Sequence, residues 1–93
     1  MTEKWIEPSL SANEKKLYVV KDYLAETYAK MIIVFNYSTS KIEIQLNRTE
    51  ENKIIALPGA CLQKYSCFKD FYVIEKSGKS ISSGELLIYI WGG

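Results

Sequence analysis

The sequence predicts an all-β fold, a small antiparallel β-sandwich or partly open barrel of five to seven short strands. Residues 41–48 alternate between apolar and polar side chains, which is typical of a strand with one buried face. Turn-forming residues recur about every ten residues along the chain. The last segment, residues 85–91, is rich in β-branched and aromatic residues, which favour strands.

The middle of the chain predicts three strands in succession. Residues 31–35 form a continuous apolar run, the pattern of a strand buried on both faces, and residues 36–40 have turn chemistry. In residues 41–48 we expect Ile42, Ile44 and Leu46 to face the core. Residues 53–57 return as a short strand that stops at Pro58. We expect these strands to pair in order as a meander.

The rest of the chain completes the predicted domain. We expect a loop at residues 58–66 and strands at 68–76 and 85–91. Residues 17–23 favour a strand, although good helix formers leave a helix over residues 15–31 as an alternative. Residues 1–16 are mostly polar and lack a period of two, so we expect an extended N-terminal arm. The chain is then an arm, 1–16, followed by one β domain, 17–93.

Composition excludes several classes of function. The 93-residue chain is 47% hydrophobic with a net charge of +1, values that argue against disorder and against electrostatic binding to nucleic acid or an anionic membrane. No apolar run reaches the roughly 20 residues that span a bilayer. The N-terminal segment lacks the apolar region of a secretory signal peptide, so we expect synthesis in the cytosol.

No residue pattern indicates catalysis. The chain contains no histidine, which removes the Ser–His and Cys–His nucleophile pairs and imidazole metal ligands. The glutamates and aspartates are scattered, and we interpret them as solvated charges, including Glu43, Asp70 and Glu75. We therefore expect a protein that is not an enzyme, with no catalytic residue, no cofactor and no metal ion.

The two cysteines, Cys61 and Cys67, leave two interpretations open. In a cytosolic chain they are reduced, structural residues, and in an oxidising compartment they form a disulfide across the 58–68 loop. A nucleic-acid platform around Lys64 and Tyr65 is disfavoured, because acidic and basic residues balance.

The final strand carries the functional prediction. Leu86, Ile88 and Ile90 can fill the core, which leaves apolar groups on the opposite face as well. Either the domain's own chain covers that second face, or it is an interface to another subunit. We predict the interface, with these contributing residues: Trp5, Ile6, Leu87, Tyr89 and Trp91.

Residues 36–91 carry a loose resemblance to a known family. The matching positions are Asn36, Ser38, Ile42, Ile44, Asn47, Leu57, Pro58, Ile81, Ser82, Gly84 and Glu85. This sequence pattern resembles that of small β-sandwich virion proteins of tailed bacteriophages. The resemblance implies a structural role in a virus particle, as capsid decoration or a head–tail connector. It also implies synthesis in the host cytoplasm, homo-oligomers and partners among capsid, portal or tail subunits.

Two other functions fit the same residues. A β-sandwich that binds carbohydrate or a cell surface would use Trp5, Tyr65 or Trp91 as stacking platforms. A small viral protein that binds one host protein would use an exposed sheet edge.

Overall fold

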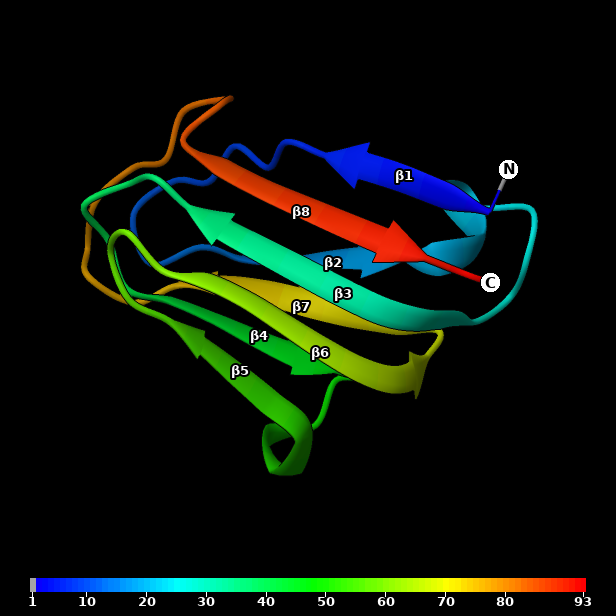
Figure 1. Cartoon of the computed structure of the whole chain (residues 1–93). Helices are drawn as coiled ribbons and strands as arrows, with labels where there is room; N and C mark the ends of the chain where they lie inside the picture. The colour runs from blue at the N-terminus through cyan, green and yellow to red at the C-terminus, as the bar shows by residue number, and fades with distance from the viewer. Residues whose placement is uncertain (1) are drawn as a thin grey trace.

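The computed structural model, which describes residues 2–93, is a β-sandwich of two four-stranded antiparallel sheets (Figure 1). The first sheet has the order β1-β8-β3-β6 and the second the order β2-β7-β4-β5. Within residues 2–93 the chain forms eight strands and two short 3-10 helices: β1 (Glu3–Ile6), β2 (Lys15–Val19), η1 (Val20–Asp22), β3 (Ala29–Asn36), β4 (Ile42–Leu46), η2 (Glu50–Asn52), β5 (Lys53–Ala56), β6 (Cys61–Phe68), β7 (Asp70–Glu75) and β8 (Leu86–Trp91).

The predicted fold class is confirmed, with one strand more than the upper end of the expected range. The competing helix over residues 15–31 does not form. The strand expected at residues 17–23 ends at Val19, and η1 takes the chain through Asp22. In β4, Ile42, Ile44 and Leu46 all face the core, as expected from their period of two.

The N-terminal arm proves to be part of the sandwich. Residues 3–6 form β1, an edge strand that pairs antiparallel with β8, so that Ile6 lies opposite Ile88. Ile6 is 5% exposed and belongs to the core. Lys15 and Lys16 begin β2 in the other sheet. The residues before the predicted boundary at residue 16 therefore belong to the sandwich and do not form a separate arm.

The predicted meander is wrong because β3 and β4 lie in different sheets, and only β4 and β5 form a hairpin. At the crossing from β3 to β4, the buried Asn36 side chain replaces a hairpin turn. Its Nδ2 donates to the carbonyl oxygens of Ser40 and Ala56, at 2.8 and 2.9 Å. Its Oδ1 accepts from the N–H and hydroxyl of Ser38. These bonds satisfy polar groups that the crossing removes from water.

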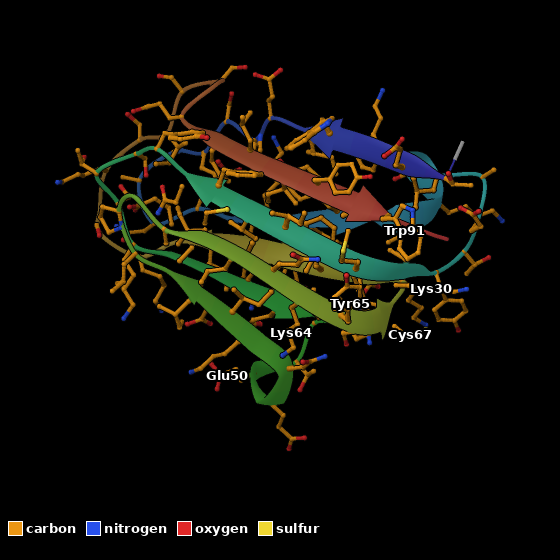
Figure 2. All side chains as sticks on the ribbon, viewed as in Figure 1. Lys30, Glu50, Lys64, Tyr65, Cys67 and Trp91 are labelled. Atoms are coloured by element: carbon orange, nitrogen blue, oxygen red, sulfur yellow. The ribbon has the colours of Figure 1, made fainter. Side chains whose placement is uncertain are left out.

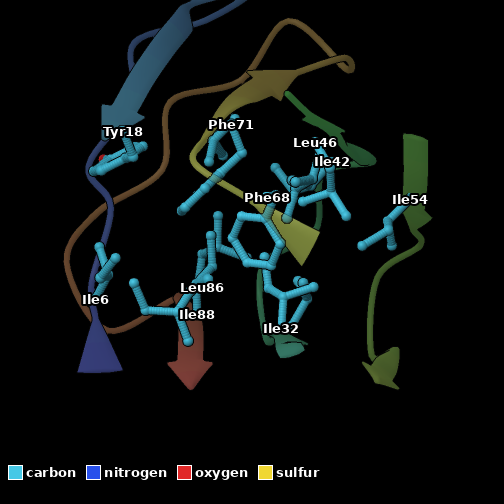
Figure 3. Close-up of a cluster of buried hydrophobic side chains, with 14 of the residues drawn as sticks. Ile6, Tyr18, Ile32, Ile42, Leu46, Ile54, Phe68, Phe71, Leu86 and Ile88 are labelled. Carbon is cyan, nitrogen blue, oxygen red and sulfur yellow. The ribbon is translucent and has the colours of Figure 1, made fainter. Parts of the chain in front are cut away.

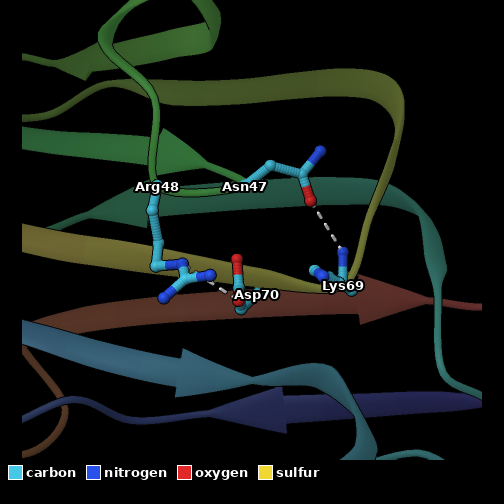
Figure 4. Close-up of polar contacts among 4 residues, drawn as sticks. All are labelled: Asn47, Arg48, Lys69 and Asp70. Atoms are coloured by element: carbon cyan, nitrogen blue, oxygen red, sulfur yellow. Dashed lines mark hydrogen bonds and ion pairs between the residues drawn. The ribbon is translucent and has the colours of Figure 1, made fainter.

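The predicted loop at residues 58–66 is also wrong, because residues 61–68 form β6, which pairs with β3. The chain then changes sheets between β6 and β7. Asn47 fixes this corner, because its Oδ1 accepts a hydrogen bond from the N–H of Lys69 (Figure 4). Its Nδ2 donates to the carbonyl oxygen of Cys67. The neighbouring Arg48 pairs with the buried Asp70 at 3.2 Å.

Inward-facing side chains from both sheets fill the core (Figure 3). Phe68 and Phe71, both fully buried, meet edge to face at 5.8 Å between ring centroids, and Tyr18 stacks on Phe71 at 5.5 Å. Aromatic pairs of this kind add to the stability that comes from area burial. Because both phenylalanines are buried, neither is available to a nucleic-acid platform around Lys64.

Candidate protein-interaction face

The strand β8 divides its side chains between the core and the outer surface of the first sheet. Leu86, Ile88 and Ile90 have no exposed area, which confirms the predicted inward set. The intervening Leu87, Tyr89 and Trp91 are only partly buried. Because β8 lies between β1 and β3, this second set is at the centre of the outer face of the sheet.

Neighbouring strands place further apolar side chains beside this set. In the register of the sheet, Trp5 on β1 lies opposite Tyr89, while Met31, Ile33 and Phe35 on β3 lie opposite Trp91, Tyr89 and Leu87. Tyr65 on β6 lies opposite Met31. We name this surface the aromatic face and define it by eight residues: Trp5, Met31, Ile33, Phe35, Tyr65, Leu87, Tyr89 and Trp91.

The rings of the aromatic face contact one another and remain open to solvent. The Trp5 ring lies 4.9 Å from that of Tyr89 and 5.7 Å from that of Phe35, between centroids. Trp5 is nevertheless 51% exposed and Tyr65 is 71% exposed. Tyr65 and Trp91 lie near the same end of the sheet, on β6 and β8 (Figure 2). The chain itself therefore leaves the two edges of this face uncovered.

Few polar groups interrupt the aromatic face. The Tyr89 hydroxyl donates a hydrogen bond to the Glu3 carboxylate, and this bond raises the pKa of Tyr89. On β6, Gln63 Nε2 donates to the Met31 sulfur and to the Tyr65 hydroxyl, at 3.0 Å each. Glu3 lies opposite Trp91 in the register of β1 and β8, so its carboxylate is a charged group on the β1 side of the aromatic face.

The outer face of the second sheet differs in charge. Its register brings together Lys15, Ile74, Glu43 and Ile55 in one row and Leu17, Tyr72, Gln45 and Lys53 in the next. Lys15 Nζ lies 4.3 Å from the centroid of the Tyr72 ring, and Gln45 Nε2 donates to Glu43 at 2.7 Å. Charged groups and their hydrogen bonds thus cover the apolar side chains of this sheet, whereas the polar contacts on the aromatic face come from Glu3 and Gln63.

The structure brings together four of the five predicted interface residues: Trp5, Leu87, Tyr89 and Trp91. Ile6, the fifth, points into the core and does not belong to the face. Sequence reasoning missed the contribution of β3, because the run at residues 31–35 was interpreted as buried on both sides. It also missed Tyr65 as part of the face, because β6 was interpreted as a loop.

The disulfide across the 58–68 loop is ruled out by the position of the two cysteines. Cys61 and Cys67 are free and exposed on β6, where five residues lie between them. The six steps from one to the other span about 20 Å of strand, far beyond disulfide reach. Within residues 2–93, no cluster of three or more Cys, Asp or Glu side chains is placed to hold a metal ion. In the same residues, no helix has the length and apolar character needed to cross a bilayer.

No family model, curated protein or solved structure matches this chain. Among the surfaces described above, the aromatic face combines the largest exposed rings with the least charge, which is the composition found at the centre of protein interfaces.

Proposed function

We propose that this protein is a non-enzymatic binding and assembly module that docks on another protein subunit through the aromatic face. The observation that carries the proposal is the outer face of the first sheet, where Trp5 and Tyr65 expose more than half of their surface beside Leu87, Tyr89 and Trp91. Contiguous apolar patches of this kind mark interaction sites in proteins that are otherwise well covered.

The two most exposed rings set the scale of the binding energy. An aromatic side chain can bury 150–250 Å², so a partner that covers Trp5 and Tyr65 removes about 100 Å² from each. At about 25 cal/mol per Å², each ring then contributes about 2.5 kcal/mol before the cost of association. Replacing either ring should therefore weaken docking measurably.

The size of the face favours repeated, symmetric contacts. From Leu87 to Trp91 it extends about 13 Å along the strands, and it extends about 14 Å across the four strands. This footprint is well below the roughly 800 Å² that each partner contributes to a standard interface. A single contact of this size is weak, and a symmetric assembly compensates because many copies bind together.

For the biological setting we propose a structural protein of a tailed-bacteriophage particle, as capsid decoration or a head–tail connector. The support is the resemblance over residues 36–91, together with a β-sandwich fold and an uncovered apolar sheet face. In this setting the chain is made in the host cytoplasm, forms homo-oligomers and contacts capsid, portal or tail subunits.

Light scattering after size exclusion, with variants of the face, tests the proposal. The wild-type chain is expected to associate as its concentration rises towards about 1 mM, where contacts of about −4 kcal/mol are half formed. Tyr65→Ser should abolish this association. Tyr28→Ser is the matched control, because Tyr28 is a tyrosine, 50% exposed, that lies in the loop before β3 and is not one of the eight residues of the face. A monomer at every concentration, or equal loss in both variants, would contradict assembly through the aromatic face.

Carbohydrate binding is the second candidate, and the exposure of the Trp5 and Tyr65 rings favours it. Sugars stack on aromatic faces but also need hydrogen-bond partners, and the polar groups beside these rings are few: Gln63, the Tyr89 hydroxyl and Glu3. A glycan array probed with the wild-type chain and Trp5→Ala separates the two functions. A sugar that binds the wild type alone would favour the carbohydrate function over assembly.

A further inference from the structure

The strand β6 is an edge strand of the first sheet, so one of its two sides has no neighbouring strand. Two hydrogen bonds show which of its backbone N–H and C=O groups point to that side. The Asn36 N–H donates to the Ala60 carbonyl on the β6 side of β3, whereas the Tyr37 N–H donates to the Glu85 carbonyl on the β8 side. Backbone groups alternate in direction along an antiparallel strand. Even-numbered residues of β6 therefore bond to β3, and odd-numbered residues direct their N–H and C=O groups away from the sheet.

The open part of this edge has a defined end. Asn47 Nδ2 donates to the outward-directed carbonyl of Cys67, at 3.2 Å, so the corner next to β7 occupies the edge there. A register irregularity between β3 and β6 lies in the same region, beyond the pair formed by Met31 and Tyr65. Between Cys61 and Tyr65 the pairing with β3 is regular. The N–H and C=O groups of Cys61, Gln63 and Tyr65 therefore form a continuous template for an added strand.

Side chains on this edge select the strand that can be added. Lys64 faces the inner side of β6, like Ser66, whose hydroxyl accepts a hydrogen bond from Asn52 of η2, the helix that precedes β5 (Figure 2). Within residues 2–93 the only ion pair closer than 4 Å joins Arg48 and Asp70, so Lys64 has no acidic partner. A strand added at this edge would place one of its residues directly opposite Lys64.

A second copy of β6 is a poor occupant. The strand contains no acidic residue, so no register of β6 against itself gives Lys64 an opposite charge. In the symmetric register centred on Lys64, the two lysines face each other, and like charges directly opposite are unfavourable. An inward-facing charge on an edge strand is a known means of excluding self-pairing while the backbone stays open.

We propose that the β6 edge binds an extended peptide segment of a partner protein as an additional antiparallel strand, with an acidic residue opposite Lys64. The position opposite Leu62 is apolar, because Leu62 is partly buried and packs against the core. The positions opposite Tyr65, Gln63 and Cys61 lie on the outer side and extend the aromatic face. Backbone bonds supply affinity, and Lys64 and Leu62 supply selectivity.

This inference does not depend on the proposed assembly function. The edge uses the backbone of β6, whereas assembly uses rings on β1, β3 and β8 as well. A chain that stays monomeric can still bind a peptide at the edge, and a chain that assembles through its face can leave the edge empty. Peptide titration therefore tests binding at the edge, light scattering tests assembly through the face, and a negative result in one does not decide the other.

The experiment titrates the full chain, labelled with ¹⁵N, with the peptide acetyl-Thr-Val-Glu-Val-Leu-Val-Thr-amide, whose Glu falls opposite Lys64 and whose Leu falls opposite Leu62. Binding is expected to shift the amide signals of Cys61, Gln63 and Tyr65 and to slow their hydrogen exchange, because those N–H groups gain partners. The amides of Leu62 and Lys64 already bond to β3, and their exchange should change less.

Charge reversal tests selectivity. The same peptide with Lys in place of Glu should bind the wild type about tenfold more weakly, because an attractive cross-strand pair becomes a repulsive one. Lys64→Glu should reverse this preference. Lys21→Glu, which reverses an exposed charge in η1, is the matched control and should leave the preference unchanged.

Proline tests the backbone template. The Gln63 N–H points away from the sheet, so Gln63→Pro removes one edge donor and no bond to β3, and edge strands tolerate proline in this orientation. Gln63→Ala is the reference because it loses the same side chain and keeps the N–H. We expect Gln63→Pro to bind the peptide at least about tenfold more weakly than Gln63→Ala, because one backbone hydrogen bond to the added strand is lost.

Three results would overturn the proposal. The first is no shift of the β6 amides with the Glu peptide up to about 1 mM, the weakest affinity considered. The second is binding that shifts residues of the aromatic face alone and leaves the exchange of Cys61, Gln63 and Tyr65 unaltered. The third is equal binding by Gln63→Pro and Gln63→Ala with both folded, as judged by their thermal transitions.

Discussion

Replacing Glu75 by glutamine removes the charge from a carboxylate that joins two loops at one end of the sandwich. The Glu75 side chain is 1% exposed. Its Oε1 accepts hydrogen bonds from the backbone N–H groups of Asn13, Gly78 and Lys79, and its Oε2 accepts one from Ser77, all between 2.8 and 3.1 Å. A glutamine side chain must direct its NH₂ group at one of these donors, which loses that bond and the charge that strengthens the others.

The expected cost of Glu75→Gln is about 2 kcal/mol at neutral pH. Leaving one buried donor without a partner costs about 1–3 kcal/mol, and the position of the carboxylate next to surface loops reduces the effect of its charge. In a domain of this size, a loss of about 2 kcal/mol lowers the thermal midpoint by about 10 °C. Glu51→Gln, at an exposed glutamate in η2, is the matched control and should change it little.

The stabilisation by the Glu75 carboxylate should also depend on pH. Burial alone would raise the pKa of Glu75, but hydrogen bonds from the backbone of Asn13, Ser77 and Gly78 outweigh it and lower the pKa to about 2, from 4.5. A depressed carboxyl pKa stabilises the folded state above the unfolded-state value, and this stabilisation is lost as the pH falls from about 4.5 to about 2. The difference between wild type and Glu75→Gln should therefore narrow over that window.

Urea unfolding of both proteins, at pH values from neutral to strongly acidic, measures this difference directly. If Glu75→Gln unfolds at the same urea concentration as the wild type at neutral pH, the buried carboxylate does not stabilise the fold. If the gap between the two proteins is constant down to the lowest pH, the stabilisation does not come from the ionised carboxylate.

Three further predictions concern the crossing from β3 to β4, the core and the cysteines. Asn36→Ala should cost about 3 kcal/mol in urea unfolding, because the carbonyls and Ser38 groups that its side chain satisfies lose their partners. Ile88→Ala should cost about 2–5 kcal/mol through a core cavity. Leu87→Ala, at the next residue but on the aromatic face, should cost clearly less, and equal costs would contradict the assigned strand orientation. Cys61 and Cys67 should both react with a thiol reagent in the folded protein, and an unreactive oxidised pair would contradict their separation on β6.

The strongly alternating strands could be predicted from the sequence. Ile42, Ile44 and Leu46 in β4, and Leu86, Ile88 and Ile90 in β8, follow a period of two with strongly apolar residues, and each set is buried as expected. The opposite side of β8 followed from the same period, which is why Leu87, Tyr89 and Trp91 could be placed together without a structure.

Strand partners could not be predicted, because a period of two shows which side of a strand is buried and not which strand lies beside it. The crossing at Asn36 resembles a hairpin turn in composition, and only its buried side-chain bonds distinguish the two. The edge strand β6 was missed for a related reason. Its inward positions, Leu62, Lys64 and Ser66, are only partly buried, so they are not uniformly apolar and their alternation carries little signal.

The burial of Glu75 could have been predicted from its position in the alternating pattern of β7. Phe71 and Val73 fix the inward side of β7, and Glu75 is the next residue of the same parity. A glutamate at an inward position, with the turn residues Ser77 and Gly78 two and three positions later, is placed to accept their N–H groups. The assumption that a scattered carboxylate is solvated failed here. It also failed for Asp70, which pairs with Arg48, and for Glu43, which is 5% exposed and accepts a hydrogen bond from Gln45.

The aromatic face and the edge of β6 are related through Tyr65. As an odd-numbered residue of β6, it directs its ring to the outer surface and its N–H away from β3. A strand added at this edge would therefore place alternate side chains next to the Tyr65 ring and widen the aromatic face by about 4.8 Å, one strand spacing. Because the face alone is smaller than a standard interface, this widening would add apolar area where a partner needs it. Peptide at the edge should then strengthen docking on the face, and by linkage docking should strengthen peptide binding by the same factor.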